Sequence, residues 1–285
     1  MKYLAIILLF STHLWAQHKV IYGDDNRQDL YQVKDSRIKE LARSTAAMVQ
    51  YYQIAQAPHA MSNITGMTLA MRGVCQDQRF VNQLSAASCS GFLVAPDLLV
   101  TAGHCIQTQD DCDKNKWVFD FAITDHNQNG STITVPMGNV YGCKEIVSQE
   151  LNNSNRLDYA VIRLDRKVMD RTPLKFRTSG KLRKRTSLFV IGHPSGLPTK
   201  VADHAYVRRL KSGYFVANLD TFGGNSGSAV FNKETLEVEG ILVRGDKDYT
   251  ERRHENCLEV NHCRNRGCKG EEVTRITSVP LPSSL

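Results

Sequence analysis

After its first residues, the 285-residue sequence has no hydrophobic run long enough to span a membrane. It also has no internal repeat, no low-complexity tract and no linker that divides the chain convincingly. No long segment shows the 3.6-residue hydrophobic period of an amphipathic helix. These absences argue against a membrane-spanning mature protein. They leave a chain long enough for one all-β domain or two small domains.

Concentrated charge and metal-ligand spacing are also lacking. The net charge is +7, but the basic residues are scattered apart from the run 181–185, Lys-Leu-Arg-Lys-Arg. Such a short run is usually a solvated loop, so we expect no nucleic-acid partner. Cys263 and Cys268 have no matching Cys/His pair at the spacing of a zinc site. The acidic segment 110–113 does not have the ligand spacing of a complete calcium-binding loop. We therefore expect no metal and no cofactor.

The N-terminus has the pattern of a secretory signal peptide over residues 1–16. Lys2 precedes an apolar run from Leu4 to Phe10, and Leu14-Trp15-Ala16 offers a small-residue cleavage site. The alternative is an N-terminal core strand. The signal peptide predicts a secreted or periplasmic protein with no membrane association after its removal, and we expect a monomer.

All eight cysteines follow that cleavage site, and an even number in an exported chain indicates disulfides. They are Cys75, Cys89, Cys105, Cys112, Cys143, Cys257, Cys263 and Cys268. Cys105 lies 16 residues after Cys89, which fits a hairpin joined across its base.

Short apolar runs between turn residues predict an antiparallel β domain over residues 45–285. Before it, residues 17–44 read as an N-terminal arm or short propeptide, with a helical turn near 36–42. The Cys-rich tail from Asp246 is expected to wrap the body. The predicted strands include 46–49, 67–71, 91–94, 98–101, 117–123, 132–135, 159–164, 187–191, 214–217 and 240–243.

The segment 221–230, Thr-Phe-Gly-Gly-Asn-Ser-Gly-Ser-Ala-Val, places Ser226 in a glycine-rich turn before a buried strand. A hydroxyl becomes a strong nucleophile only when a base takes its proton and backbone donors stabilise the resulting oxyanion. Glycines on both sides allow the N–H groups of Gly224 and Ser226 to converge on one point. An ordinary turn is the alternative.

His104 is the best candidate for that base, because an apolar strand leads through a small-residue turn directly to its imidazole. A carboxylate is then needed to orient the ring. Asp158 heads the strand 159–164 and is favoured over Asp165, which lies at the other end of that strand.

The motifs T-A-G-H-C, D-Y-A-V-I and G-N-S-G-S, in this order, resemble the chymotrypsin-like serine peptidase superfamily. The sequence is most similar to its bacterial glutamyl-endopeptidase-like and trypsin-like branch, as are the segments 20–27 and 191–196. The resemblance implies an all-β fold of two six-stranded antiparallel barrels with the active site in the cleft between them. It implies a serine endopeptidase acting on proteins or peptides, with His104, Asp158 and Ser226 as the triad.

The resemblance also points to substrate-binding residues. Asp220, six residues before Ser226, occupies the place of the pocket acid that selects Lys or Arg, although it could instead pair with a neighbouring arginine. Thr221 would contact the bound side chain. Leu242 stands where glutamyl-specific members carry a histidine, so an acidic preference is less expected. Asn225 replaces the aspartate that pairs with a new N-terminus in animal trypsins, which leaves activation by cleavage after Lys19 open.

Two further points complete these expectations. Cys112 and Cys143 suit a bridge beside the first barrel, so Cys75 and the three C-terminal cysteines would pair among themselves. The alternative function is a catalytically idle, disulfide-stapled secreted binding module on the same fold, whose mark would be a broken triad.

Overall fold

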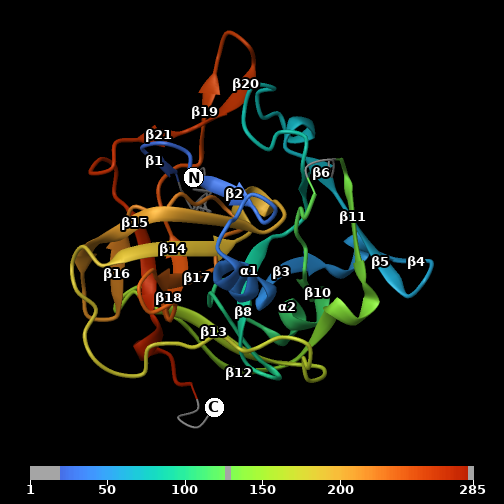
Figure 1. Ribbon diagram of the computed structural model, residues 1–285, viewed down its shortest axis with the longest axis horizontal. Coiled ribbons are helices and arrows are strands. Elements are labelled where there is room, and N and C mark those ends of the chain that lie inside the picture. Colours follow the sequence, from blue (N-terminus) through green and yellow to red (C-terminus); the bar gives the residue numbers. More distant parts are fainter. Residues whose placement is uncertain (1–19, 126–129, 282–285) are drawn as a thin grey trace, which may run out of the picture.

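The computed structural model describes residues 20–125 and 130–281 (Figure 1). The predicted signal peptide, residues 1–16, and Lys19 lie outside the described residues. The described chain forms two six-stranded antiparallel barrels, which confirms the predicted fold class. Among the described residues no helix is long and apolar enough to cross a membrane.

The first barrel closes in the strand order β10-β12-β13-β9-β8-β3, and every pairing in it is antiparallel. Strands β8 and β9 are buried along their whole length, as expected of apolar runs covered on both faces. The six strands are β3 (Thr45–Gln50), β8 (Cys89–Ala95), β9 (Leu98–Thr101), β10 (Asn115–Phe119), β12 (Val140–Leu151) and β13 (Asp158–Leu164).

The second barrel has the order β14-β17-β18-β22-β16-β15 and closes through a further pairing of β14 with β15. A short N-terminal strand, β2 (Arg27–Asp29), extends this sheet by pairing with β15. The six barrel strands are β14 (Ser187–Gly192), β15 (Lys200–Leu210), β16 (Tyr214–Ala217), β17 (Ala229–Asn232), β18 (Val238–Arg244) and β22 (Glu271–Arg275).

Smaller elements decorate the barrels. The helices are α1 (Ser36–Arg43) and α2 (Gln109–Lys114), with 3-10 turns η1 (Tyr51–Gln53), η2 (Ala70–Arg72), η3 (Met137–Asn139), η4 (Pro194–Gly196) and η5 (Ile276–Ser278). The remaining strands are β1 (Ile21–Tyr22), β4 (Ile54–Ala57), β5 (Met61–Thr65), β6 (Met67–Thr68), β7 (Leu84–Ser85), β11 (Thr132–Pro136), β19 (Tyr249–Arg252), β20 (Cys257–Val260) and β21 (His262–Cys263).

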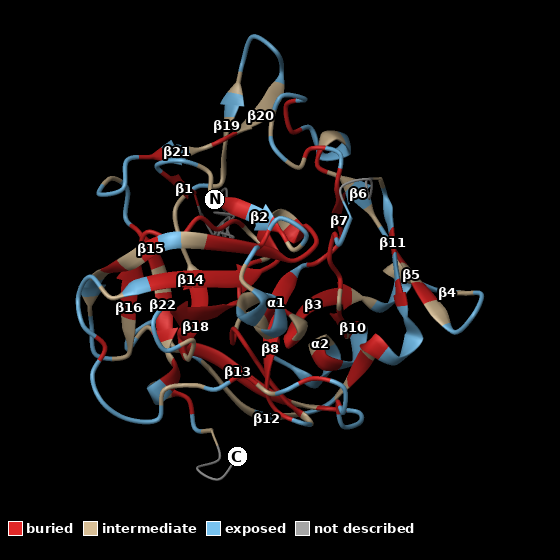
Figure 2. Cartoon of the chain, viewed as in Figure 1, coloured by how far each residue is buried: buried red, intermediate tan, exposed pale blue. Residues whose placement is uncertain are grey.

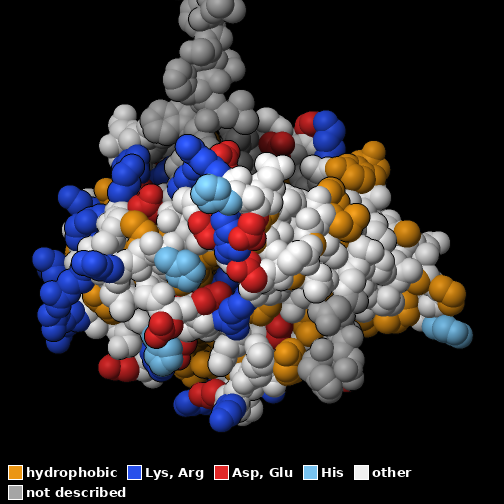
Figure 3. All heavy atoms as spheres, turned by 90° about the horizontal axis from the view of Figure 1, so that it is seen from above, with side chains coloured by type: hydrophobic (Ala, Val, Ile, Leu, Met, Phe, Trp, Pro, Cys, Tyr) orange, Lys and Arg blue, Asp and Glu red, His pale blue; other side chains and the backbone are white. Residues whose placement is uncertain are grey.

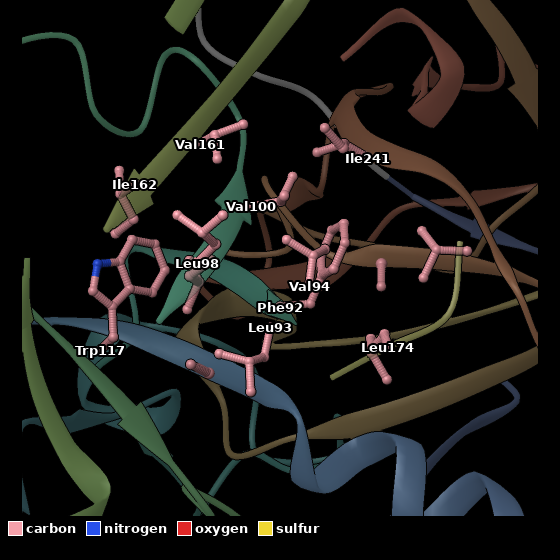
Figure 4. Close-up of a cluster of buried hydrophobic side chains, with 14 of the residues drawn as sticks. Phe92, Leu93, Val94, Leu98, Val100, Trp117, Val161, Ile162, Leu174 and Ile241 are labelled. Atoms are coloured by element: carbon pink, nitrogen blue, oxygen red, sulfur yellow. The ribbon is translucent and has the colours of Figure 1, made fainter. Parts of the chain in front are cut away.

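A continuous apolar core joins the two barrels. In Figure 4, Phe92 and Val100 of the first barrel lie near Ile241 of β18, and Trp117 closes the far side of the cluster. The buried segments in Figure 2 follow the barrel strands, whereas the β19–β20 hairpin projects outward with mostly half-buried strand residues and an exposed tip at 253–256. The barrels are therefore packed against each other over a shared dry surface.

Four disulfides account for all eight cysteines. Cys89–Cys105 and Cys112–Cys143 are the two predicted bridges. Cys75–Cys257 and Cys263–Cys268 confirm that the other four cysteines pair among themselves. Cys75–Cys257 joins residues that are 182 positions apart and ties the start of β20 to the loop between η2 and β7.

The N-terminal segment is integrated into the second barrel. Lys200 of β15 forms a buried ion pair with Asp29 of β2, with Nζ and Oδ1 2.6 Å apart, and Nζ also donates to Gln83 Oε1. Burial lowers the pKa of Lys200 to about 8, although the neighbouring Asp29 opposes the shift. Lys200 is therefore charged at neutral pH.

The strand predictions were correct in place but incomplete. The helical turn near 36–42 is α1. The predicted strand 67–71 shrinks to β6 and then turns into η2, and 117–123 ends at Phe119. The sequence reading omitted β12, β15, β22 and α2. The acidic segment 110–113 lies in α2, where Asp111 completes a capping box with Thr108.

Removing one partner of the buried Lys200–Asp29 pair leaves an uncompensated charge, so we expect Lys200→Met to lower the free energy of unfolding by about 3–5 kcal/mol. Lys200→Met combined with Asp29→Leu should recover part of that loss, because no charge is then left unpaired. Urea unfolding measures both. Lys114→Met, which breaks an exposed pair with Asp110, is the control and should change little. Equal effects of Lys200→Met and Lys114→Met would contradict the assignment.

Candidate active site

His104 lies directly after β9, in a turn that packs tightly against the first barrel. A Cβ atom on the preceding Gly103 would lie 2.3 Å from the carbonyl oxygen of Glu150, so only glycine permits this close approach. The His104 backbone N–H donates to Asp158 Oδ1 at 3.1 Å, and its Nδ1 lies 2.9 Å from Asp158 Oδ2. Since a carboxylate can only accept, Nδ1 carries the proton in this contact.

Asp158, at the start of β13, has a fully buried side chain. Burial by itself raises the pKa of this carboxyl. The hydrogen bond from His104 and the charges of His104 and Arg244 outweigh that effect and hold the pKa below its usual value. The carboxylate is therefore ionised. Its competitor Asp165 accepts from the backbone N–H of Gly142 instead.

The loop that carries Ser226 is fixed against the first barrel through its backbone. The Ser90 N–H donates to the carbonyl oxygen of Ser226 at 2.7 Å, and that oxygen lies 3.7 Å from Cys105 Sγ. The next residue, Gly227, has φ +89°, and a Cβ there would lie 2.0 Å from Ser90 O. The structure thus brings the Ser226 backbone beside Cys105, the residue that follows His104.

Ser90 also holds the backbone at Gly224, two residues before Ser226. Ser90 Oγ donates to the Gly224 carbonyl oxygen at 2.8 Å, and Gly224 has φ +89°. A Cβ at Gly224 would lie 2.5 Å from the carbonyl oxygen of His193. A cavity of about 330 Å³ adjoins this peptide and is lined in part by Gly223, Gly224 and Ser195.

His193, which precedes η4, is a second histidine near the site, but it plays a structural part. Its ring is fully buried, and burial lowers the pKa of His193 to about 3. Nδ1 lies 3.1 Å from the Leu197 carbonyl oxygen and must donate to it, so the ring stays neutral. The imidazole therefore shapes the loop beside Gly224.

Asp220 does not lie open at the base of a pocket. Its Oδ1 accepts from the Tyr22 N–H at 2.7 Å and its Oδ2 from the Asn26 N–H at 3.3 Å. Burial raises the pKa of Asp220 to about 7, even though both hydrogen bonds favour the charged form. The expectation that this carboxylate is presented to a substrate is therefore wrong. The pairing with a neighbouring arginine is not seen either, because the N-terminal segment occupies both oxygens.

Asn225 also differs from the aspartate that pairs with a new N-terminus in animal trypsins. Its side-chain oxygen accepts from Ser228 Oγ at 3.1 Å, and the residue is buried in its own loop.

Thr221 contacts a carboxylate that the sequence reading missed. Its hydroxyl donates to Oε2 of Glu271, the first residue of β22, at 2.6 Å, and Glu271 is fully buried. Gly245 packs directly against this carboxylate, because a Cβ there would lie 1.9 Å from Glu271 Oε2. Leu242, by contrast, packs into the core of the second barrel, so the prediction that it contacts substrate is wrong.

Arg244, at the end of β18, is the second missed residue. One guanidinium nitrogen donates to Asp158 Oδ2 at 2.9 Å, the same oxygen that faces His104 Nδ1. Another lies 3.6 Å from Glu272, which in turn pairs with Arg156. A cation from the second barrel thus touches the carboxylate of the first.

Cys89, Cys105 and His104 bring potential metal-ligand atoms within 4.8 Å of one another. Both sulfurs are bonded to each other in a disulfide, so they are not thiolates that could ligate a metal.

The comparisons with known proteins agree with this geometry. Residues 89–241 match the model of the trypsin-like peptidase domain family. None of the curated proteins matches the chain.

Solved structures with the same fold have low sequence identity. A Glu endopeptidase is 16% identical with a TM-score of 0.51, over 91% of this chain and 95% of that one. The VesB protease of Vibrio cholerae is 14% identical with a TM-score of 0.53, over 89% and 64%. A scabies mite inactivated protease paralogue is 14% identical with a TM-score of 0.51, over 90% and 94%. These likenesses support the fold alone. Because the family model covers more than half of the sequence, the chain belongs to the trypsin-like peptidases and is a serine endopeptidase.

Proposed function

We propose that the protein hydrolyses peptide bonds through a triad of Ser226, His104 and Asp158. Ser226 Oγ attacks the substrate carbonyl carbon while His104 Nε2 takes its proton. The tetrahedral intermediate collapses to an acyl-enzyme as His104 returns the proton to the leaving amine. Water then repeats the sequence and releases the acid. The observation that carries this proposal is the 2.9 Å contact between His104 Nδ1 and the ionised, buried Asp158.

The oxyanion would be bound by the N–H groups of Gly224 and Ser226. The carbonyl groups of the same two residues accept from Ser90 of the first barrel, which supports a fixed backbone around both N–H groups. Donors that are already oriented need no reorganisation during the reaction, which is where this kind of site gains most of its rate.

The four disulfides support a protein that works in an oxidising compartment, secreted or periplasmic, where it would act as a monomer on protein or peptide substrates. The alternative is a catalytically idle binding module. The inactivated mite protease paralogue is an example of an inactivated protein with a similar fold. The intact pairing of His104 with Asp158 favours the active enzyme.

We also propose a preference for Lys or Arg at the cleaved position, with Glu271 as the selecting acid in place of Asp220. Glu271 lies between Thr221, five residues before Ser226, and Gly245 on the chain segment after β18. A buried carboxylate at this point would pair with a cationic side chain and reject apolar ones. An acidic preference is the alternative, because one protein of the same fold is a Glu endopeptidase.

A fluorophosphonate probe tests the nucleophile. We expect the mature wild-type protein to be labelled and Ser226→Ala to remain unlabelled, with kcat/KM on a peptide substrate at least roughly 10⁴-fold lower, because the triad acts as a unit. Mass spectrometry of the labelled peptide locates the adduct. Equal labelling of both proteins would remove Ser226 from the mechanism, and an unlabelled wild type would favour the idle module.

The contact between Arg244 and Asp158 predicts a shift in pH dependence. The positive charge of Arg244 weakens the ability of Asp158 to stabilise protonated His104. In Arg244→Gln the His104 ring should therefore be protonated more readily. As the pH is lowered, the variant should lose activity at a higher pH than the wild-type protein does. We expect the acidic limb of the kcat/KM profile to move upward by roughly one pH unit.

Arg244→Lys is the matched control and should restore most of the original profile. Glu272 and Arg156, the other charged groups in this network, remain in place in both variants. A curve that is lowered at every pH without a shift would mean that Arg244 acts only through packing.

A peptide library read by mass spectrometry tests the specificity. In Glu271→Gln we expect the ratio of kcat/KM for Lys over Leu at the cleaved position to fall by roughly tenfold or more, because the ion pair is lost. Asp220→Asn should keep the ratio, since Asp220 binds backbone amides. Retained fluorophosphonate labelling shows that each variant is folded. An unchanged ratio in Glu271→Gln, or a wild type that cleaves after Glu, would overturn the assignment.

A further inference from the structure

The outer surface of the second barrel holds a cleft of about 880 Å³ that the proposed mechanism does not use. Its wall is formed by β15 together with the loops on either side. Lys and Arg side chains gather along this edge of the molecule in Figure 3, on the side where β14, β15 and β16 lie in Figure 1. The cations that line the cleft are Lys184, Arg185, Arg208, Arg209, Lys233 and Arg266.

One wall is the basic run 181–185, which the sequence reading treated as a solvated loop. Arg185 has φ +66° and its N–H donates to the Val207 carbonyl oxygen at 2.9 Å. The Val207 N–H donates back to Thr186 at 3.1 Å. The run is therefore fastened to β15 in a fixed turn and does not stand free in solvent.

The opposite wall is a loop of the C-terminal tail, closed by the Cys263–Cys268 disulfide. The guanidinium of Arg208 donates to the carbonyl oxygens of Arg266 and Gly267, both at 2.9 Å. Arg209 donates to the Lys269 carbonyl oxygen. Arginines of β15 thus hold the loop by its backbone, and Arg266 is fixed at the rim of the cleft.

The charge in the cleft is poorly compensated. Asp203 is the one acidic side chain of the described chain that lines it, and it pairs with Lys233. The lining therefore carries a net charge of +5. Lys184, Arg185 and Arg266 are exposed, and their side chains have no hydrogen bond or ion pair within residues 20–125 and 130–281. Three free cations around one concave surface form a receptor for anions.

We propose that this cleft binds an anionic polysaccharide that carries sulfate or phosphate groups. Guanidinium groups bind such oxyanions through paired N–H donors, and several cations in one cleft suit a chain with repeated charges better than a single ion. His204 and Tyr206 are the two ring-bearing side chains among the described lining residues, so the cleft has little of the stacking surface on which single-stranded nucleic acids are bound. Disulfides place the protein where charged polysaccharides occur.

The proposal is independent of the peptidase mechanism, because His104, Asp158 and Ser226 do not line the cleft. Binding and catalysis can therefore be lost separately, and loss of one does not imply loss of the other.

The test compares two triple variants of the full-length mature protein, each lowering the net charge by three. The cleft variant is Lys184→Ala/Arg185→Ala/Arg266→Ala. The control is Lys39→Ala/Lys144→Ala/Lys167→Ala, three exposed lysines that lie outside the cleft. Isothermal titration with a heparin decasaccharide at several salt concentrations measures affinity. A neutral dextran of similar length, a phosphorylated mannan fragment and duplex DNA are titrated alongside.

We expect wild type and control to bind the sulfated chain at 150 mM salt, and the cleft variant to bind it roughly tenfold or more weakly with a shallower salt dependence. Fluorophosphonate labelling should be equal in all three proteins, which shows that they are folded. Binding of the phosphorylated chain alone would identify phosphate as the recognised group. Equal weakening in both variants, no binding by wild type, or tighter binding of DNA than of either polysaccharide would overturn the proposal.

Discussion

The structure depends on one fully buried carboxylate, that of Asp158. An ion in such a position is stable only if it is paired and hydrogen-bonded. Its partners come from both barrels, since His104 follows a strand of the first barrel and Arg244 ends a strand of the second. The Asp158 backbone carbonyl also accepts from Thr274 Oγ1 of β22 at 3.1 Å. The same residue therefore orients the imidazole and fixes the two barrels relative to each other.

A second constraint acts on the backbone around Ser226. Ser90 holds the carbonyl groups of Gly224 and Ser226, while Gly227 approaches Ser90 and Thr101 so closely that a methyl group would not fit. These contacts join the loop of the second barrel to strands β8 and β9 of the first. Because His104 lies in the turn that follows β9, the position of Ser226 relative to the imidazole depends on these contacts, one of which is made by the Ser90 hydroxyl.

The residues that can be singled out from the sequence alone are those whose surroundings are local. His104, Asp158 and Ser226 each stand at the junction of a turn and a strand, and the Cys89–Cys105 bridge crosses one hairpin. The motif around each of these residues is only a few residues long, so it can be recognised in the sequence. By contrast, Asp220 is held by amides 194 and 198 residues upstream, a distance over which no spacing rule operates.

Register explains the residues that were misassigned. Leu242 and Arg244 are two positions apart and would share one face of a regular strand. The pairing of β18 with β22 shifts between these two residues. Such an irregularity re-aims the side chains that follow it. Leu242 therefore packs into the core, and Arg244 reaches Asp158. A count along the sequence cannot detect this shift, which places Arg244 opposite Glu272 of β22.

The Cys-rich tail has a larger part than its composition indicates. The sequence predicts that it wraps the body, yet β22 is a strand of the second barrel, paired with β18 and β16, and supplies Glu271, while β21 pairs with β1 of the N-terminal segment. The loop between β21 and β22 forms one wall of the basic cleft and is held there by Arg208 and Arg209. Arg208 donates to three backbone carbonyl groups of this loop, and Arg209 donates to one. The cations that remain available for a ligand are consequently the ones at the rim, so the charge that binds and the charge that builds the cleft belong to different residues.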